Sequence, residues 1–258
     1  MSTAPRPSQH FAIVGAGMAG IACARTLVQA GHQVTVFEKS RGLGGRMATR
    51  DSAFGSFDHG AQYFTARDPR FLAALETTPK LCKRWSANSV QVLDELGRVA
   101  AAALPASDAH WVAVPGMQSL VATWAEPLTD ARSVELQTRV TKIERDALQP
   151  DQWQLRTEAL DGAQHVYSGF HGVLLAMPAA QAQSLLQTSK QALPWVKQID
   201  NVQVAPCWTL MLAFPQAMQP GLSTLGPQWN AARSTHHRIA WLARESSKPG
   251  RGAVERWT

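Results

Sequence analysis

Residues 11–50 read FAIVGAGMAGIACARTLVQAGHQVTVFEKSRGLGGRMATR, and this stretch decides the fold. It begins with Phe11–Val14, a short apolar run of the kind that forms a buried parallel strand. Good helix formers follow from Met18, and Gly31 stands where such a helix would stop. The β-rich run Gln33–Phe37 comes next. The stretch therefore predicts a strand–helix–strand unit that opens a Rossmann-like α/β domain.

The turn between the first strand and the helix contains Gly15, Gly17 and Gly20 in the pattern G-x-G-x-x-G. Gly15 permits the tight turn, Gly17 lets a pyrophosphate approach the backbone, and Gly20 lets the helix pack closely on the strand. The helix N-terminus adds unpaired N–H groups and a partial positive charge. Glu38 follows 18 residues after Gly20, where a carboxylate accepts from ribose hydroxyls and repels a 2′-phosphate. The pattern predicts a site for FAD or NAD, and it argues against NADP.

A glycine- and arginine-rich loop, KSRGLGGRMAT at residues 39–49, follows directly after Glu38. Gly44 and Gly45 can bring backbone amides close to an anion, and Arg41 and Arg46 can add charged donors. The alternative is a flexible solvent loop. Because the loop adjoins the dinucleotide pattern, we expect it to contact phosphate.

Composition narrows the class of protein. The chain has 258 residues, of which 45% are hydrophobic, enough for one large domain or two small ones. Its three cysteines form no CxxC pair, which argues against a dithiol centre, a zinc ribbon or a disulfide framework and favours the cytoplasm. A membrane span is not expected, because no run of about 18 apolar residues exists. The net charge of +6 is scattered, so we expect no nucleic-acid partner, although it suits a small anionic ligand. Residues 1–9 are expected to form a disordered leader.

Several motifs, in order along the chain, resemble the flavin-containing amine oxidase superfamily, and more narrowly renalase and its bacterial relatives. They include EKSRGLGGRMAT (38–49), FDHGAQYFTARDP (57–69) and VPGMQSLVATWA (114–125). The resemblance implies a doubly wound, three-layer, Rossmann-like FAD-binding domain interleaved with a mixed-sheet α+β substrate domain. The expected boundaries are 10–69 and 115–185 for the first domain, and 70–114 and 186–258 for the second.

The resemblance also implies a set of cofactor-binding residues. The glycine-rich turn would hold the FAD pyrophosphate, and Glu38 would take the adenosine ribose. Arg46 would reach the phosphate or ribityl region, the segment 60–63 would lie beside the flavin ring, and the backbone of Val140 would face the adenine. The full set is Gly15, Ala16, Gly17, Met18, Ala19, Gly20, Glu38, Lys39, Arg41, Gly44, Gly45, Arg46, Gly60, Ala61, Gln62, Tyr63 and Val140. No residue is assigned a catalytic role, and no metal site is expected.

The function implied by the resemblance is that of an FAD-dependent oxidase of renalase type. Its substrate would be a small anionic dinucleotide, an off-isomer of dihydronicotinamide dinucleotide, which gives a hydride to flavin N5. O₂ would then reoxidise the flavin and form H₂O₂. Two alternatives stay open at this point: a flavin amine oxidase acting on a small amine, and a nucleotide-binding protein without catalysis.

The sequence differs from the family pattern at the C-terminus, where the chain reads GRGAVERWT (250–258). Family members continue to a Gly-Asp segment and a final helix beside the flavin. The resemblance therefore implies that this chain lacks that segment, and we expect weak or no retention of FAD.

Outside the opening unit, sequence patterns predict further elements. Asp68 and Pro69 predict the start of a helix over 69–75. Residues 81–90 are expected to continue helical structure, and residues 115–128 form another predicted helix. Strands are predicted over 134–146, 152–158, 164–176, 204–214 and 238–244.

Overall fold

The computed structural model describes residues 7–85, 90–101, 109–218, 230–234 and 239–258. The chain forms two compact units, and each is built from two separate stretches. The first unit comprises Met1–Gly45 with Trp124–Cys207, and the second comprises Arg46–Thr123 with Trp208–Thr258. The domain boundaries expected from the sequence remain a prediction, and residues 1–6 of the expected leader lie outside the described residues.

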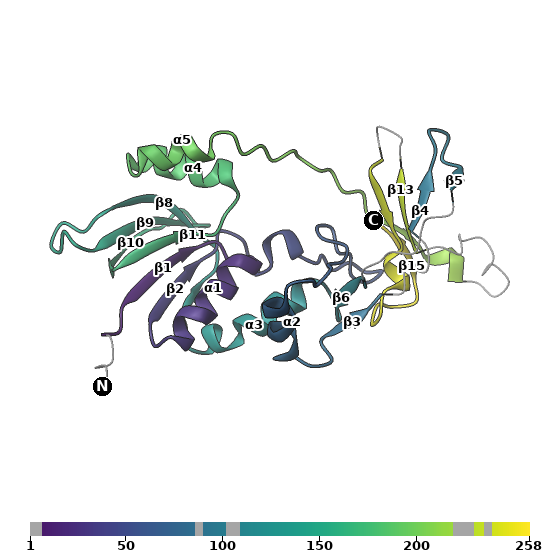
Figure 1. Cartoon of the computed structure of the whole chain (residues 1–258), viewed down its shortest axis with the longest axis horizontal. Helices are drawn as coiled ribbons and strands as arrows, with labels where there is room; N and C mark the ends of the chain where they lie inside the picture. Colours follow the sequence, from purple (N-terminus) through teal and green to yellow (C-terminus); the bar gives the residue numbers. More distant parts are fainter. Residues whose placement is uncertain (1–6, 86–89, 102–108, 219–229, 235–238) are drawn as a thin grey trace. The chain divides into compact units, whose positions relative to one another are not determined.

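A four-stranded parallel sheet forms the centre of the first unit (Figure 1). Its order is β11-β1-β2-β7, in which β1 (His10–Val14) pairs with both β2 (Gln33–Phe37) and β11 (Gly172–Leu175). The short β7 (Val134–Glu135) closes the other edge. The predicted opening strands are thus confirmed, with β1 one residue longer than expected.

Helix α1 (Met18–Gln29) contacts β1 and β2, and buries Gly20, Ile21 and Ala24. Ala12 and Val14 of β1 belong to a hydrophobic cluster together with residues of β8, β9 and β10. Because side chains alternate along a strand, Ile13 must point to the opposite face of the sheet. Both faces of the parallel sheet are therefore covered, which explains why most residues of its strands are apolar.

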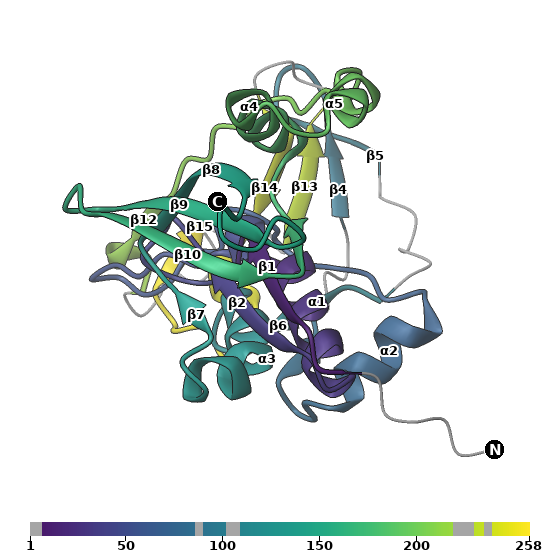
Figure 2. The same cartoon turned by 90° about the vertical axis from the view of Figure 1, so that its left-hand side faces the viewer.

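An antiparallel sheet packs on the other face of the parallel sheet, and α4 contacts its strand β8 (Figure 2). Its order is β10-β9-β8. The bounds of these elements are β8 Thr138–Arg145, β9 Trp153–Ala159, β10 Gln164–Phe170, α4 Ala179–Ser189 and α5 Leu193–Ile199. The cluster between the sheets contains Phe37, Ile143, Leu155 and Phe170, each no more than 3% exposed.

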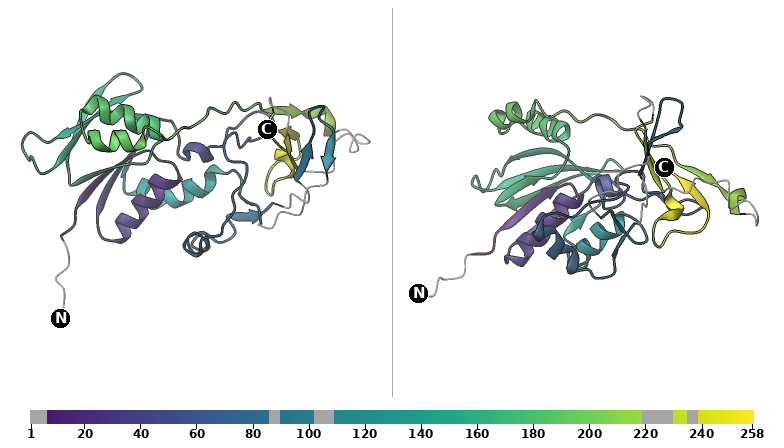
Figure 3. Two further views of the ribbon diagram at one scale, coloured as in Figure 1. Left: turned by 45° about the horizontal axis from the view of Figure 1, so that its top comes forward. Right: turned by 45° about the vertical axis from the view of Figure 1, so that its right-hand side comes forward.

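The second unit contains a mixed sheet whose order is β14-β13-β4-β5 (Figure 3). In this sheet β13 pairs with β4 in parallel, although the two strands lie far apart in sequence, and the outer pairs are antiparallel. Two smaller sheets pair β3 with β6 and β12 with β15. The strands are β3 Cys82–Arg84, β4 Val90–Leu93, β5 Val99–Ala101, β6 Trp111–Ala113, β12 Leu212–Phe214, β13 Ala231–Ser234, β14 Trp241–Ala243 and β15 Glu255–Trp257.

Helix α2 (Pro69–Glu76) also belongs to the second unit, whereas α3 (Gln118–Asp130) begins in the second unit and ends in the first. The predicted cap of α2 is confirmed, because the Asp68 side chain accepts from the N–H of Arg70 at 2.8 Å. None of the helices in the described ranges has the length and hydropathy that a bilayer crossing requires. The predicted fold class, a Rossmann-like α/β domain interleaved with a mixed-sheet α+β domain, is confirmed.

Two local predictions were wrong, and each of the two predicted strands 134–146 and 164–176 divides into two strands that belong to different sheets. Residues 82–84, expected to be helical, form strand β3, because pairing with β6 overrides a weak local preference; residues 86–89 lie outside the described residues. Of the strand predicted over 204–214, only Leu212–Phe214 is a strand, paired with β15.

The imidazole of His10 makes the stability of the first unit depend on pH. Its Nε2 lies 2.9 Å from Thr35 Oγ1, and its ring lies 4.6 Å from that of Phe170. Burial, together with the neighbouring His171, lowers the pKa of His10 below its ordinary value of 6.5. The folded state thus binds fewer protons than the unfolded state. The contribution of neutral His10 is complete above the unfolded pKa and is lost as the pH falls towards the folded pKa.

We therefore expect the urea concentration at the unfolding midpoint to decrease as the pH is lowered from about 7.5 to about 5.5. The variant His10→Gln should flatten this dependence, since an amide does not titrate in the range. His165→Gln, which changes an exposed histidine of the same unit, should leave the dependence as it is. An unaltered pH slope in the His10 variant would contradict the assignment.

Candidate dinucleotide-binding site

Two of the three glycines in the G-x-G-x-x-G pattern are required by backbone conformation and packing within the protein. Gly15 has φ +109°, and its N–H donates to Phe37 O at 2.8 Å. A Cβ on Gly15 would lie 2.7 Å from Ala176 O, and one on Gly20 would lie 1.9 Å from Gly15 O. Any side chain at either position would displace backbone, so these glycines say nothing about a ligand.

Gly17 differs from its two neighbours in the pattern. It has φ −79° and ψ −176°, an extended conformation open to any residue. The nearest atoms to a Cβ there would be Gly44 O and Gly45 Cα, both at an ordinary contact distance of 3.9 Å. Among the described residues no side chain caps the N-terminus of α1, and its first turn contains no acidic residue. The structure thus has room at Gly17, beside the positively polarised N-terminus of α1.

The carboxylate of Glu38 is fixed against this same turn. Its Oε2 accepts from the N–H of Ala16 at 2.9 Å, and its Oε1 accepts from the N–H of Ser40 at 2.8 Å. The residue is 8% exposed. Each carboxylate oxygen has two lone pairs, so each retains capacity for one further donor, such as a ribose hydroxyl. The contact with Ser40 was not predicted, since nothing in the sequence marks a glutamate that binds the second amide after it.

The predicted glycine pair lies beside the turn. Gly44 donates its N–H to Ala16 O at 3.1 Å, and a Cβ on Gly45 would lie 3.3 Å from Gly17 Cα. Both glycines have positive φ, +114° and +54°, which explains why the loop contains glycine there. The structure thus brings Gly44 and Gly45 to the residues of the G-x-G-x-x-G pattern.

The other predicted residues of the first unit surround this turn less closely. Met18 opens α1, and Ala19 is exposed in its first turn. The Nζ of Lys39 donates to Gln181 Oε1 at 3.2 Å, and Arg41 is exposed. Within the described part of the chain, neither basic side chain forms a hydrogen bond or ion pair with the turn.

Strand β8 begins next to Glu38. The N–H of Thr138 donates to Glu38 O at 2.9 Å, and the N–H of Gln137 donates to Ser40 O at 3.0 Å. Val140 follows two residues later, with its side chain in the hydrophobic cluster between the sheets. The pairing of β8 with β9 shifts register between Val140 and Lys142. The backbone of Val140 therefore lies near the Glu38 end of β2, where the register of the antiparallel sheet is irregular.

The remaining predicted residues, Arg46 and the segment 60–63, belong to the second unit. The N–H of Ala61 donates to Arg46 O at 2.9 Å, and a Cβ on Gly60 would lie 2.1 Å from the same oxygen. The close contact with the Arg46 peptide explains the glycine at position 60. The role of this segment beside a flavin remains a prediction.

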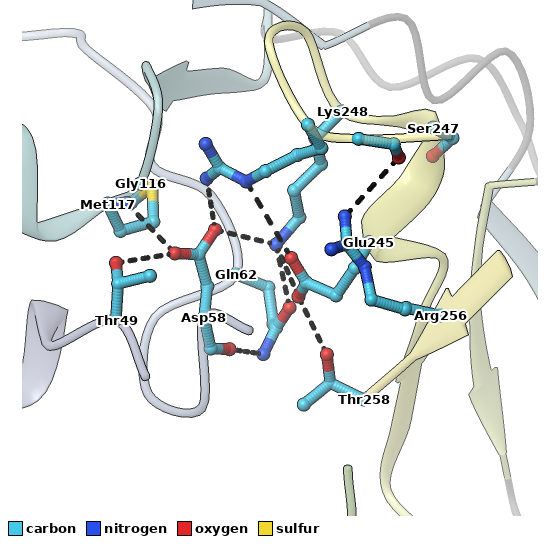
Figure 4. A network of polar contacts seen from close by, with 12 residues as sticks. Thr49, Asp58, Gln62, Gly116, Met117, Glu245, Ser247, Lys248, Arg256 and Thr258 are labelled. Carbon is cyan, nitrogen blue, oxygen red and sulfur yellow. Dashed lines mark hydrogen bonds and ion pairs between the residues drawn. The ribbon is translucent and has the colours of Figure 1, made fainter. Parts of the chain in front are cut away.

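Sequence reasoning missed a buried ionic cluster in the second unit, built around Asp58 (Figure 4). Asp58 Oδ1 accepts from Thr49 Oγ1 at 2.8 Å and from the N–H of Met117 at 2.9 Å. Asp58 Oδ2 accepts from Lys248 Nζ at 3.1 Å and from Arg251 Nη2. Burial opposes ionisation, but the two cations and the Met117 N–H outweigh it and hold the pKa of Asp58 below its usual value.

Comparison with known proteins finds sequence similarity in the N-terminal part of the chain. Residues 13–78 match the family described as NAD(P)-binding Rossmann-like domain. Over 41 residues the chain is 58% identical to an L-amino acid oxidase of Crotalus durissus cumanensis. It is 51% identical over 41 residues to the bifunctional tRNA 5-methylaminomethyl-2-thiouridine biosynthesis protein MnmC of Acinetobacter baylyi. These matches cover 16% of this chain, but only 8% and 7% of the two relatives.

The likeness to solved structures extends over nearly the whole chain. A putrescine oxidase bound to putrescine superposes with a TM-score of 0.64 at 13% sequence identity. The match covers 97% of this chain and 75% of that one. At this identity the likeness concerns the fold. The chain therefore has an amine-oxidase-like fold with a Rossmann-like α/β unit.

Proposed function

We propose that this chain binds FAD and acts as an FAD-dependent oxidase. The observation that carries the proposal is the room at Gly17, where neither backbone conformation nor packing accounts for a glycine but an approaching pyrophosphate would. Glu38 supports the same reading, because its carboxylate is fixed at that turn with acceptor capacity left for ribose hydroxyls.

Each part of the site has a role in holding the cofactor. The N–H groups at the start of α1 would bind the diphosphate, and the Gly44–Gly45 backbone beside them would line its other side. Arg41 and Arg46 would add charge-assisted donors. Glu38 would hold the adenosine ribose, and its charge would disfavour a 2′-phosphate.

The reacting end of the cofactor belongs, in this proposal, beside residues 60–63, with the adenine at the backbone of Val140. When bound, the flavin would accept a hydride from the substrate and pass two electrons to O₂, so that the oxidised product and H₂O₂ are released. The chain's residues would contribute by binding and orienting the substrate rather than by acid–base chemistry.

For the substrate we propose an off-isomer of dihydronicotinamide dinucleotide, as the resemblance to renalase implies. The net charge of +6 suits an anionic dinucleotide. A second candidate is a small amine, which the fold shared with putrescine oxidase favours. A nucleotide-binding protein without catalysis is the third.

The proposal is tested in two steps. First, FAD is titrated into the protein and binding is followed by the change in flavin fluorescence, with NAD as the competitor. Saturable binding that NAD does not displace is expected. Second, the FAD-loaded protein is mixed under anaerobic conditions with dihydronicotinamide off-isomers, with ordinary NADH, or with putrescine.

We expect the visible flavin absorption to be lost rapidly with an off-isomer only. Loss with putrescine alone would favour the amine oxidase. FAD binding without reduction by any of these compounds would favour the non-catalytic candidate. Failure to bind added FAD would reject the proposal as a whole.

A further inference from the structure

The segment 60–63, which the proposed function places beside the flavin, is tied to a fully buried lysine. Lys248 Nζ donates to Gln62 Oε1 at 2.9 Å, to Asp58 Oδ2 at 3.1 Å and to Glu245 Oε1 at 2.8 Å (Figure 4). The Lys248 side chain is 0% exposed. An ammonium group has three N–H donors, so all three are used within the second unit.

This geometry fixes which way the Gln62 amide faces. An ammonium group has no acceptor, so only the carbonyl oxygen of Gln62 can face it. The amide nitrogen must then point the other way, and there it donates to Asp58 O. A flipped amide would place two donors against each other and lose both bonds. Lys248 thus holds both ends of the segment 58–62, at the Asp58 carboxylate and at the Gln62 amide.

The hydrogen bond between Lys248 and Gln62 is not needed to balance charge in the cluster. Asp58 has a second cation in Arg251, and it accepts from Thr49 and Met117 as well. The contact with Gln62 neutralises no charge. Its effect is to fix the adjoining peptides, including that of Ala61, whose N–H donates to Arg46 O.

We propose that Lys248 is a positioning residue for FAD, which acts through Gln62 by holding the backbone of residues 60–63 in one conformation. The inference rests on the proposed function, because that function puts these residues at the flavin. Both polar atoms of the Gln62 side chain are occupied by protein, so it is the backbone of the segment that would meet the ring.

The test is a double-mutant cycle of Lys248→Met and Gln62→Met, with FAD dissociation constant, amide hydrogen exchange at Ala61 and urea stability as readouts. Each single variant is expected to raise the Kd for FAD about tenfold, and the double variant no more than either single one, because the two residues act as one unit. Exchange at Ala61 without FAD should quicken about tenfold in each variant. Gln62→Met leaves the Asp58 and Glu245 contacts of Lys248 intact, so it should fold.

The matched control is Arg256→Met, which removes another fully buried cation from the same unit. Arg256 donates to Phe54 O at 2.8 Å and to Gly252 O at 3.4 Å. This variant should lose stability while its Kd for FAD stays within about twofold. If the folded Gln62 variant binds FAD like the wild type, or if the two effects on Kd add, the positioning role is wrong.

Failure of this inference is distinguishable from failure of the proposed function. A wild-type protein that does not bind FAD rejects both, whatever the exchange rates are. A wild-type protein that binds FAD, together with variants whose Kd and Ala61 exchange are unchanged, rejects only the role of Lys248.

Discussion

Replacing Asp58 with alanine is expected to lower the free energy of unfolding by about 3–5 kcal/mol, because two buried cations then share the single carboxylate of Glu245. Lys248 and Arg251, whose side chains are 0% exposed, would both lose the Asp58 carboxylate. The Met117 N–H and Thr49 would lose their acceptor as well. Urea unfolding followed by tryptophan fluorescence measures the loss, since Trp85 lies beneath Lys248, with Nζ 5.5 Å from the ring.

Two controls separate the charge from the packing. Asp58→Asn preserves the shape but removes the charge, so it should recover only part of the loss. Asp94→Ala breaks a pair with Arg98 that is exposed at the surface, and it should cost far less. If Asp58→Ala costs no more than Asp94→Ala, the cluster does not stabilise the second unit as argued.

The variant Gly17→Ala should weaken FAD binding by roughly a hundredfold while the protein stays folded, because overpacking at a filled contact costs about 1–3 kcal/mol. A methyl group at this position meets only Gly44 O and Gly45 Cα at 3.9 Å, so the free chain can accommodate it. With FAD bound, the same methyl group would stand between the backbone and the pyrophosphate. A fluorescence titration gives the Kd, and thermal unfolding without FAD gives the stability.

Neighbouring glycines provide contrasting controls. Gly20→Ala should lower stability even without FAD, because its Cβ would lie 1.9 Å from Gly15 O. Gly252→Ala should change neither stability nor binding, because no atom of the described residues lies within 4 Å of a Cβ at that position. If Gly17→Ala destabilises the free protein as much as Gly20→Ala does, the space at Gly17 is not a ligand site.

Local features of this fold could be predicted from the sequence because neighbouring residues determine them. The unit β1-α1-β2 has its glycines, its apolar runs and Glu38 within a short stretch. Asp68 and Pro69 likewise predict the start of α2. The pairing of Cys82–Arg84 with β6 could not be predicted in this way, since the partner strand lies beyond a long intervening segment.

The candidate site was predictable to the same extent. The turn at Gly15–Gly20 follows β1, and Gly44–Gly45 follow β2 at the same edge of the sheet. The two segments therefore lie together. Asp58 and Lys248 are 190 residues apart, and no period or spacing relates them. A buried carboxylate and its cations are found only when the fold brings the two segments together.

The position of β1 between β2 and β11 has a consequence for synthesis on the ribosome. Phe11 pairs with Gly172, so the β1 edge of the nascent β1–β2 ribbon stays open until β11 has been translated. At bacterial to eukaryotic elongation rates this delay is roughly 10–30 s, long compared with hairpin formation. Ala12, which is 0% exposed in the finished fold, also stays uncovered until β8, β9 and β10, whose residues share its hydrophobic cluster, have been translated. The nascent chain should therefore be a client for chaperones that bind unpaired apolar strands until its middle third emerges.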